Sequence, residues 1–75
     1  MLTEKEIIDV INELDFGFKL DPKTTPGETT LKSLGVDSLD IYNIFVDLEA
    51  ATGRKVPDSD VEKLTTIKEL AEYFS

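Results

Sequence analysis

Residues 37–52 read DSLDIYNIFVDLEAAT, and this stretch decides what the chain can fold into. Apolar side chains recur in it at the i, i+3, i+4 and i+7 spacing that places them on one side of a helix. Gly53 follows at a position where helices commonly end. The pattern predicts a helix from Ser38 to about Thr52. Its buried face is expected to consist of Ile41, Ile44, Phe45 and Leu48.

The same helix carries a second apolar stripe on roughly its opposite side. Leu39, Tyr42 and Val46 follow one another at i, i+3 and i+7, and Ala50 continues the line. A chain of 75 residues can rarely cover a helix on both faces, so we expect this stripe to lie at the surface. The competing interpretation is that residues 16–36 fold over it.

Acidic residues border the second stripe. Residues 37–52 contain four carboxylates and no Lys or Arg. A solvated helix face would give the same composition, but apolar contacts inside an acidic rim favour recognition by a groove with basic edges. We therefore predict a partner-binding surface made of Asp37, Leu39, Asp40, Tyr42, Asn43, Val46, Asp47 and Glu49.

The segments on either side of this helix are also expected to be helical or irregular. Thr3 and Glu6 have capping-box spacing ahead of a helical apolar pattern, which predicts a first helix over roughly residues 3–15. Residues 16–36 are rich in Gly, Pro and Thr and show no regular period, which predicts a long loop. A loop of this length needs internal anchors. The candidate anchors are Phe18, Leu20, Leu31 and Leu34.

Two further capping boxes follow the central helix. Ser59 with Glu62 predicts a short helical turn, and Thr66 with Glu69 predicts the start of a last helix. No convincing strand pattern, repeat or linker is present. The fold class is therefore all-α, a small four-helix antiparallel bundle with a long first loop and a short third helix, in a single domain over residues 1–75.

The composition excludes several functions. The 16 acidic and 8 basic residues give a net charge of −8, which disfavours nucleic acid and anionic lipid as partners. The chain has no Cys and no His, and no nucleophile is paired with a positioned base, so we expect neither an enzyme nor a metal site. The absence of a long apolar run or a signal-peptide pattern leads us to expect a cytoplasmic protein without a membrane span.

Ser38 places a hydroxyl at the start of the central helix. A helix start has unpaired backbone N–H groups and a partial positive charge, so a phosphate attached there is electrostatically favoured. The alternative is that Asp37 and Ser38 simply cap an ordinary helix.

The wider sequence resembles the acyl carrier protein family. The resemblance begins at LGVDSLD, residues 34–40, and continues through Leu48-Glu49, Val56-Pro57-Asp58 and KLTT, residues 63–66. It implies that Ser38 carries 4′-phosphopantetheine derived from coenzyme A, added by a phosphopantetheinyl transferase (holo-carrier synthase), and that a monomer presents acyl thioesters to partner enzymes. Those partners would be acyl-transferring, condensing or modifying enzymes of fatty-acid, specialised lipid or polyketide synthesis, with basic docking surfaces.

A shelter for part of an acyl chain inside the bundle is one interpretation of its apolar interior, while core packing without any pocket is the alternative that each of its residues favours when taken singly. The side chains that could line such an apolar interior are Ile44, Phe45, Leu48, Val61, Leu64 and Ile67. Departures from the usual family pattern favour a specialised carrier over a housekeeping one. These departures lie at Thr30, Ser33, Tyr42, Asn43, Ala50, Ala51, Arg54 and Lys55.

Three alternatives remain open at this level. A peptidyl carrier would load an aminoacyl group on the same serine, and the Asp37-Ser38-Leu39-Asp40 context favours the acyl class. An acidic helical adaptor would bind a basic partner without a covalent cofactor. A calcium module at residues 58–60 is the weakest of the three, because the Gly and the terminal Glu of a 12-residue calcium loop are missing.

Overall fold

The computed structural model describes residues 2–74. It contains four α-helices and one 3-10 helix, and an isolated antiparallel bridge joins Thr30 to Thr66. The described residues form no strand, so the predicted all-α bundle with a long first loop and a short third helix is confirmed. The elements are α1 (Glu4–Glu13), η1 (Lys32–Leu34), α2 (Ser38–Thr52), α3 (Asp58–Val61) and α4 (Ile67–Phe74).

Helix α1 begins with the predicted capping box. The Glu6 N–H donates to Thr3 Oγ1 at 3.2 Å, and the Thr3 N–H donates to Glu6 Oε1 at 3.0 Å. The helix ends earlier than predicted, because Leu14 closes the last turn and Asp15 has a left-handed φ of 57°. The helical spacing of apolar residues includes Leu14, although the backbone leaves the helix after Glu13.

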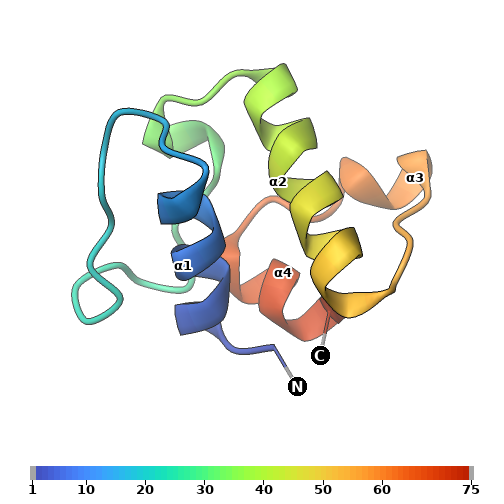
Figure 1. Cartoon of the computed structure of the whole chain (residues 1–75), viewed down its shortest axis with the longest axis horizontal. Helices are drawn as coiled ribbons and strands as arrows, with labels where there is room; N and C mark the ends of the chain where they lie inside the picture. Colours follow the sequence, from blue (N-terminus) through green and yellow to red (C-terminus); the bar gives the residue numbers. More distant parts are fainter. Residues whose placement is uncertain (1, 75) are drawn as a thin grey trace.

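Helix α2 has the predicted bounds, and Gly53 ends it with a left-handed φ of 75°. α1 packs against both α2 and α4, and α3 lies at the other side of α2 (Figure 1). The core lies among α1, α2 and α4 and takes one further side chain from the long loop. Its buried residues are Ile7, Ile8, Ile11, Leu31, Ile44, Phe45, Leu48, Ile67, Leu70, Ala71 and Phe74.

The predicted capping box at Ser59 is wrong. Helix α3 begins at Asp58 with Pro57 at the N-cap position, and no side chain caps it. The Asp60 and Val61 N–H groups both donate to the Pro57 carbonyl, at 2.8 and 3.2 Å. Because the first turn closes on the Pro57 carbonyl, Ser59 lies inside the helix and is not its cap.

The long loop is anchored as predicted and contains one element that the sequence pattern did not show. Leu31 is 2% exposed, and Phe18, Leu20 and Leu34 are partly buried against the core. Figure 1 shows the loop passing on the side of α1 that faces away from α2 and α3. The unpredicted element is η1, whose three residues are too few to produce a recognisable period.

Asn12 holds the middle of this loop. Its Nδ2 donates to the Leu20 carbonyl at 3.0 Å, and its Oδ1 accepts from the Leu20 N–H at 2.8 Å. The amide side chain therefore replaces the backbone partners that a strand would have provided.

Three backbone hydrogen bonds join the second half of the loop to the start of α4, and one of them runs from the Lys68 N–H to the Gly27 carbonyl at 2.9 Å. The Leu31 N–H donates to the Thr65 carbonyl at 2.9 Å, and the Ile67 N–H donates to the Thr29 carbonyl at 3.2 Å. These bonds, together with burial of the Leu31 side chain, fix the position of η1 against the start of α4, and α2 begins four residues after η1.

Candidate functional site

The start of α2 is capped by Asp37 and not by Ser38. The Asp40 N–H donates to Asp37 Oδ1 at 2.9 Å, and the Asp37 N–H donates to Asp40 Oδ2 at 3.4 Å. Ser38 is the first helical residue; its side chain is exposed, and its hydroxyl makes no hydrogen bond to any part of residues 2–74. Capping therefore accounts for Asp37, and the Ser38 hydroxyl is available for other chemistry.

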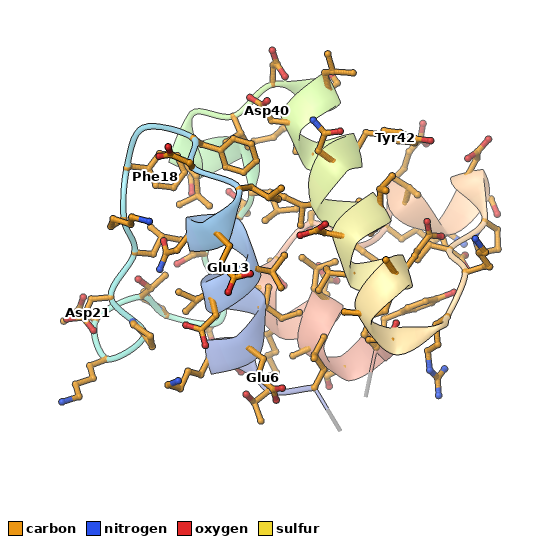
Figure 2. All side chains as sticks on the ribbon, in the orientation of Figure 1. Glu6, Glu13, Phe18, Asp21, Asp40 and Tyr42 are labelled. Atoms are coloured by element: carbon orange, nitrogen blue, oxygen red, sulfur yellow. The ribbon has the colours of Figure 1, made fainter. Side chains whose placement is uncertain are left out.

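A surface pocket of about 530 Å³ opens beside Ser38. It lies between the start of η1, the start of α2 and the segment that follows α3. Figure 2 shows Tyr42 extending from α2 on the side of α3, while Asp40 lies on the opposite side of the helix. The volume falls within the range of about 300–1,000 Å³ found for small-molecule sites. The pocket is lined by Leu31, Lys32, Ser38, Ile41, Tyr42, Val61, Glu62, Leu64 and Thr65.

The structure divides the predicted acyl-lining residues into two groups. Val61 and Leu64 line the pocket beside Ser38. The other four, Ile44, Phe45, Leu48 and Ile67, are buried in the core and do not border it.

Sequence reasoning missed three apolar or aromatic walls of the pocket. Ile41 had been assigned to the buried face of the helix, Tyr42 to the outer stripe and Leu31 to a loop anchor. No local sequence signal brings them together, because η1, α2 and α3 meet only in the folded chain.

The second apolar stripe of α2 is exposed. Leu39, Tyr42 and Val46 are 69%, 60% and 42% exposed, and they are the large hydrophobic residues that remain at the surface among residues 2–74. The loop over residues 16–36 packs elsewhere, so the interpretation in which it covers this stripe is wrong.

The acidic residues beside the stripe differ in their surroundings. Asp37, Asn43 and Asp47 are exposed, whereas Asp40 and Glu49 are partly buried. Glu49 Oε2 accepts from the Val56 N–H at 2.7 Å and so holds the connection between α2 and α3. Glu49 therefore has a structural role that the sequence did not predict.

The wall of the pocket at Thr65 is held by Glu69. One oxygen, Glu69 Oε1, accepts from the Thr65 N–H at 3.0 Å and from the Thr66 N–H at 3.1 Å, and it also accepts from both hydroxyls. The Glu69 N–H in turn donates to Thr66 Oγ1 at 3.1 Å, which confirms the predicted capping box. The two hydrogen bonds from Thr65 are the main reason that the pKa of the Glu69 carboxyl lies below its ordinary value of 4.5; desolvation opposes them, and the bonds from Thr66 lower the pKa further.

Residues 2–74 contain no group of His, Cys, Asp or Glu side chains arranged to hold a metal ion. No helix in this part of the chain is long and apolar enough to cross a bilayer. The acidic residues 58–60 lie in α3 and not in a calcium-binding loop.

An exposed serine hydroxyl at a capped helix start, beside a pocket, is accessible to a modifying enzyme and lies where an attached phosphate is electrostatically favoured. Residues 15–74 match the family described as "Phosphopantetheine attachment site". The acyl carrier protein of Lactobacillus johnsonii is 36% identical over 75 residues, which cover 97% of this chain and 94% of that protein. That of Syntrophobacter fumaroxidans is 32% identical over 71 residues, 93% of this chain and 84% of that protein. The chain belongs to the acyl carrier protein family.

A longer relative is the mitochondrial acyl carrier protein of Dictyostelium discoideum, 38% identical over 77 residues and 97% of this chain. The chain spans 62% of that relative's length. Membership of the family means that this chain is a carrier domain for covalently attached 4′-phosphopantetheine.

The Glu69 contacts give a pH-dependent prediction. Because the folded-state pKa is lowered, the ionised carboxylate stabilises the fold above pH 4.5, and this contribution is lost as the pH falls through the lower folded-state value. We expect Glu69→Gln to unfold at a lower temperature than the wild type at pH 7, and the gap to narrow below pH 4.5. Thermal unfolding followed by circular dichroism, repeated at steps of about one pH unit between pH 3 and pH 7, measures the difference in unfolding temperature and its change with pH.

The matched control is Glu13→Gln, which removes one carboxylate from the exposed end of α1. A gap of the same size and pH dependence in this control would show that Glu69 acts only through net charge.

Proposed function

We propose that the protein holds acyl intermediates as thioesters on a phosphopantetheine arm attached to Ser38 and presents them to enzymes that build fatty acids, specialised lipids or polyketides. The observation that carries this proposal is the Ser38 hydroxyl, which is exposed and unbonded while Asp37 supplies the helix cap. When attached, the arm supplies the thiol that bears the acyl group.

The residues around Ser38 fit such an attachment. The hydroxyl lies at the positive end of a 15-residue helix, where a phosphodiester is electrostatically favoured. No side chain of residues 2–74 could serve it as a paired His base, because the chain has no His. As the family resemblance implies, the transferase supplies the base, Ser38 Oγ forms the new bond to phosphorus as it loses its proton, and the nucleotide portion of coenzyme A leaves.

The attachment is tested by mass. Incubation with coenzyme A and a broad-specificity phosphopantetheinyl transferase should add one phosphopantetheine to the wild type and none to Ser38→Ala, measured by intact mass spectrometry. The control is Ser59→Ala, which removes another exposed serine in the first turn of a helix, between Asp58 and Asp60. Modification of Ser38→Ala, or loss of modification in Ser59→Ala, would contradict the assignment.

The exposed stripe and its acidic border support a partner-binding role for α2. The stripe offers apolar contacts at Leu39, Tyr42 and Val46, and Asp47 lies exposed beside them. Apolar contact supplies most of the affinity of such surfaces, while charge accelerates and orients the encounter. The proposed partners are the transferase and acyl-handling enzymes whose docking surfaces are basic.

Charge reversal tests this surface. We expect Asp47→Lys to lower kcat/KM of a transferase for this carrier about tenfold at low salt, because a repulsive charge replaces an attractive one at the contact. The difference should shrink in about 1 M salt, where screening is strong. Steady-state kinetics of holo-protein formation measure it.

Glu13→Lys makes nearly the same change of charge on α1. An equal loss of kcat/KM in this control would mean that the transferase responds to the total charge of the carrier and not to the α2 surface.

The pocket beside Ser38 supports a role in sheltering the first part of an acyl chain. Four apolar side chains of this pocket come from the loop, α2 and the α3 region: Leu31, Ile41, Val61 and Leu64. A longer chain would have to enter between core residues that are fully buried, such as Ile44 and Leu48. The pocket is therefore the proposed entrance, and the core residues predicted from the sequence are its proposed inner extension.

If the pocket encloses part of the acyl chain, acylation should raise the Tm of the protein. Burial of six methylenes of an octanoyl group contributes at most about 5 kcal/mol, before the cost of widening the pocket. Each kcal/mol retained raises Tm by about 4–8 °C in a domain of this size. We therefore expect octanoyl-loaded protein to melt several degrees above the unloaded holo-protein.

Val61→Thr should reduce this gain, because it places a hydroxyl of equal size in the pocket. Val46→Thr makes the same change on the exposed stripe and should leave the gain intact. An octanoyl form no more stable than the holo-protein would refute the sheltering role.

A further inference from the structure

The pocket beside Ser38 contains one basic side chain that the site described above does not explain. Lys32 lines the same pocket as Ser38, and it is the only Lys or Arg among the described residues that do so. The ion pair found within residues 2–74 joins Lys5 to Asp9, at the far end of α1, so the Lys32 ammonium is not committed to a carboxylate there. Lys32 is therefore a cation without a carboxylate partner among the described residues, on the wall of the pocket that also contains Ser38.

The backbone holds Lys32 in place. It is the first residue of η1, which follows the buried Leu31 and ends at Gly35 with a left-handed φ of 83°. The Gly35 N–H donates to the Lys32 carbonyl at 3.1 Å, and the Leu31 N–H donates to the Thr65 carbonyl at 2.9 Å. The root of the lysine side chain is therefore fixed beside the pocket, while its exposed end remains free to reach a ligand.

The charged residues next to Ser38 in the sequence are acidic, so the position of Lys32 matters for a phosphate attached there. Asp37 and Asp40 flank Ser38, and no Lys or Arg occurs in residues 37–52, so a phosphodiester on Ser38 joins a region that is already negative. The helix start offsets part of that repulsion. Lys32 is the basic residue placed to offset more of it, and it lies on the pocket side of Ser38, whereas the outer stripe of α2 carries no cation.

We propose that the Lys32 ammonium pairs with the phosphodiester of the arm on Ser38 and so directs the arm over the pocket instead of along the outer stripe of α2. Lys32 is in this sense a positioning residue for the arm. The inference rests on the proposed attachment at Ser38, and it adds a specific electrostatic contact that determines the direction of the arm.

The test compares the unmodified and phosphopantetheine-bearing forms of four proteins. These are the wild type, Lys32→Gln, Lys32→Arg and a matched control, Lys63→Gln, which removes an exposed lysine that does not line the pocket. Intact mass confirms that each holo-protein is fully modified. The quantity measured is the Tm of the holo form minus the Tm of the unmodified form, so that any effect of the substitution on the fold itself cancels.

We expect this difference to be about 1–5 °C lower in Lys32→Gln than in the wild type at low salt, the effect of losing one exposed ion pair. Lys32→Arg should restore it, Lys63→Gln should match the wild type, and the deficit of Lys32→Gln should shrink in about 1 M salt. Amide NMR gives a second readout: adding the arm should shift the Thr65 resonance in the wild type and shift it less in Lys32→Gln.

Equal differences in the wild type and Lys32→Gln, with equal shifts at Thr65, would overturn the proposal while leaving attachment at Ser38 intact. An equal deficit in Lys63→Gln would also overturn it, because the effect would then follow net charge alone. If no protein gains the mass of the arm, the attachment itself fails and the role of Lys32 falls with it.

Discussion

Two backbone hydrogen bonds connect the segment at Thr29–Leu31 to the segment at Thr65–Ile67, and the site depends on them. They fasten the end of a long irregular loop to the start of α4. Together with the bond from the Lys68 N–H to the Gly27 carbonyl, this contact fixes where η1 lies and therefore where α2 begins. Glu69 reinforces it by accepting the N–H groups of Thr65 and Thr66 with one oxygen. The position of Ser38 is thus set by residues about thirty positions further along the chain, since local structure alone would leave the loop end free.

The side chains of helix α2 lie in three different environments: the core, the exposed stripe and the pocket wall. Ile44 and Leu48 face α1 and α4 and are completely buried, whereas Leu39 and Val46 remain exposed. Tyr42 belongs both to the exposed stripe and to the pocket wall. A bundle of this size cannot enclose an entire helix, so one apolar side of α2 remains available to other proteins. The same side chain can then contact a partner and border the proposed acyl entrance.

At the start of α2, the residues that cap the helix are not the residue that is proposed to carry the arm. Asp37 and Asp40 satisfy each other's backbone N–H groups, so the helix start is stable without the serine. Ser38 can then be modified without loss of a cap. The negative charge of the two aspartates suits basic partner surfaces, but it also makes a further phosphodiester less favourable, and Lys32 lies where it can compensate.

The elements that depend on local order could be predicted from the amino-acid sequence. The spacing of Ile41, Ile44 and Leu48 predicted the bounds of α2, and Thr3 with Glu6 predicted the start of α1, because periodicity and capping act within one or two turns. The family motif around Ser38 likewise lies in consecutive residues. The predicted capping box at Ser59 was wrong because the first turn of α3 closes on the Pro57 carbonyl, which leaves Ser59 inside the helix.

The surfaces that these elements share became known only from the folded chain. Tertiary packing buried Leu31, left the stripe at Leu39 exposed, and joined Lys32, Ile41 and Leu64 around one pocket. It also turned Glu49 toward the Val56 N–H, a contact seven residues away that no capping pattern describes. The physical reason is that burial and pocket walls depend on segments brought together by non-local packing, whereas helix formation and capping depend on neighbours along the chain.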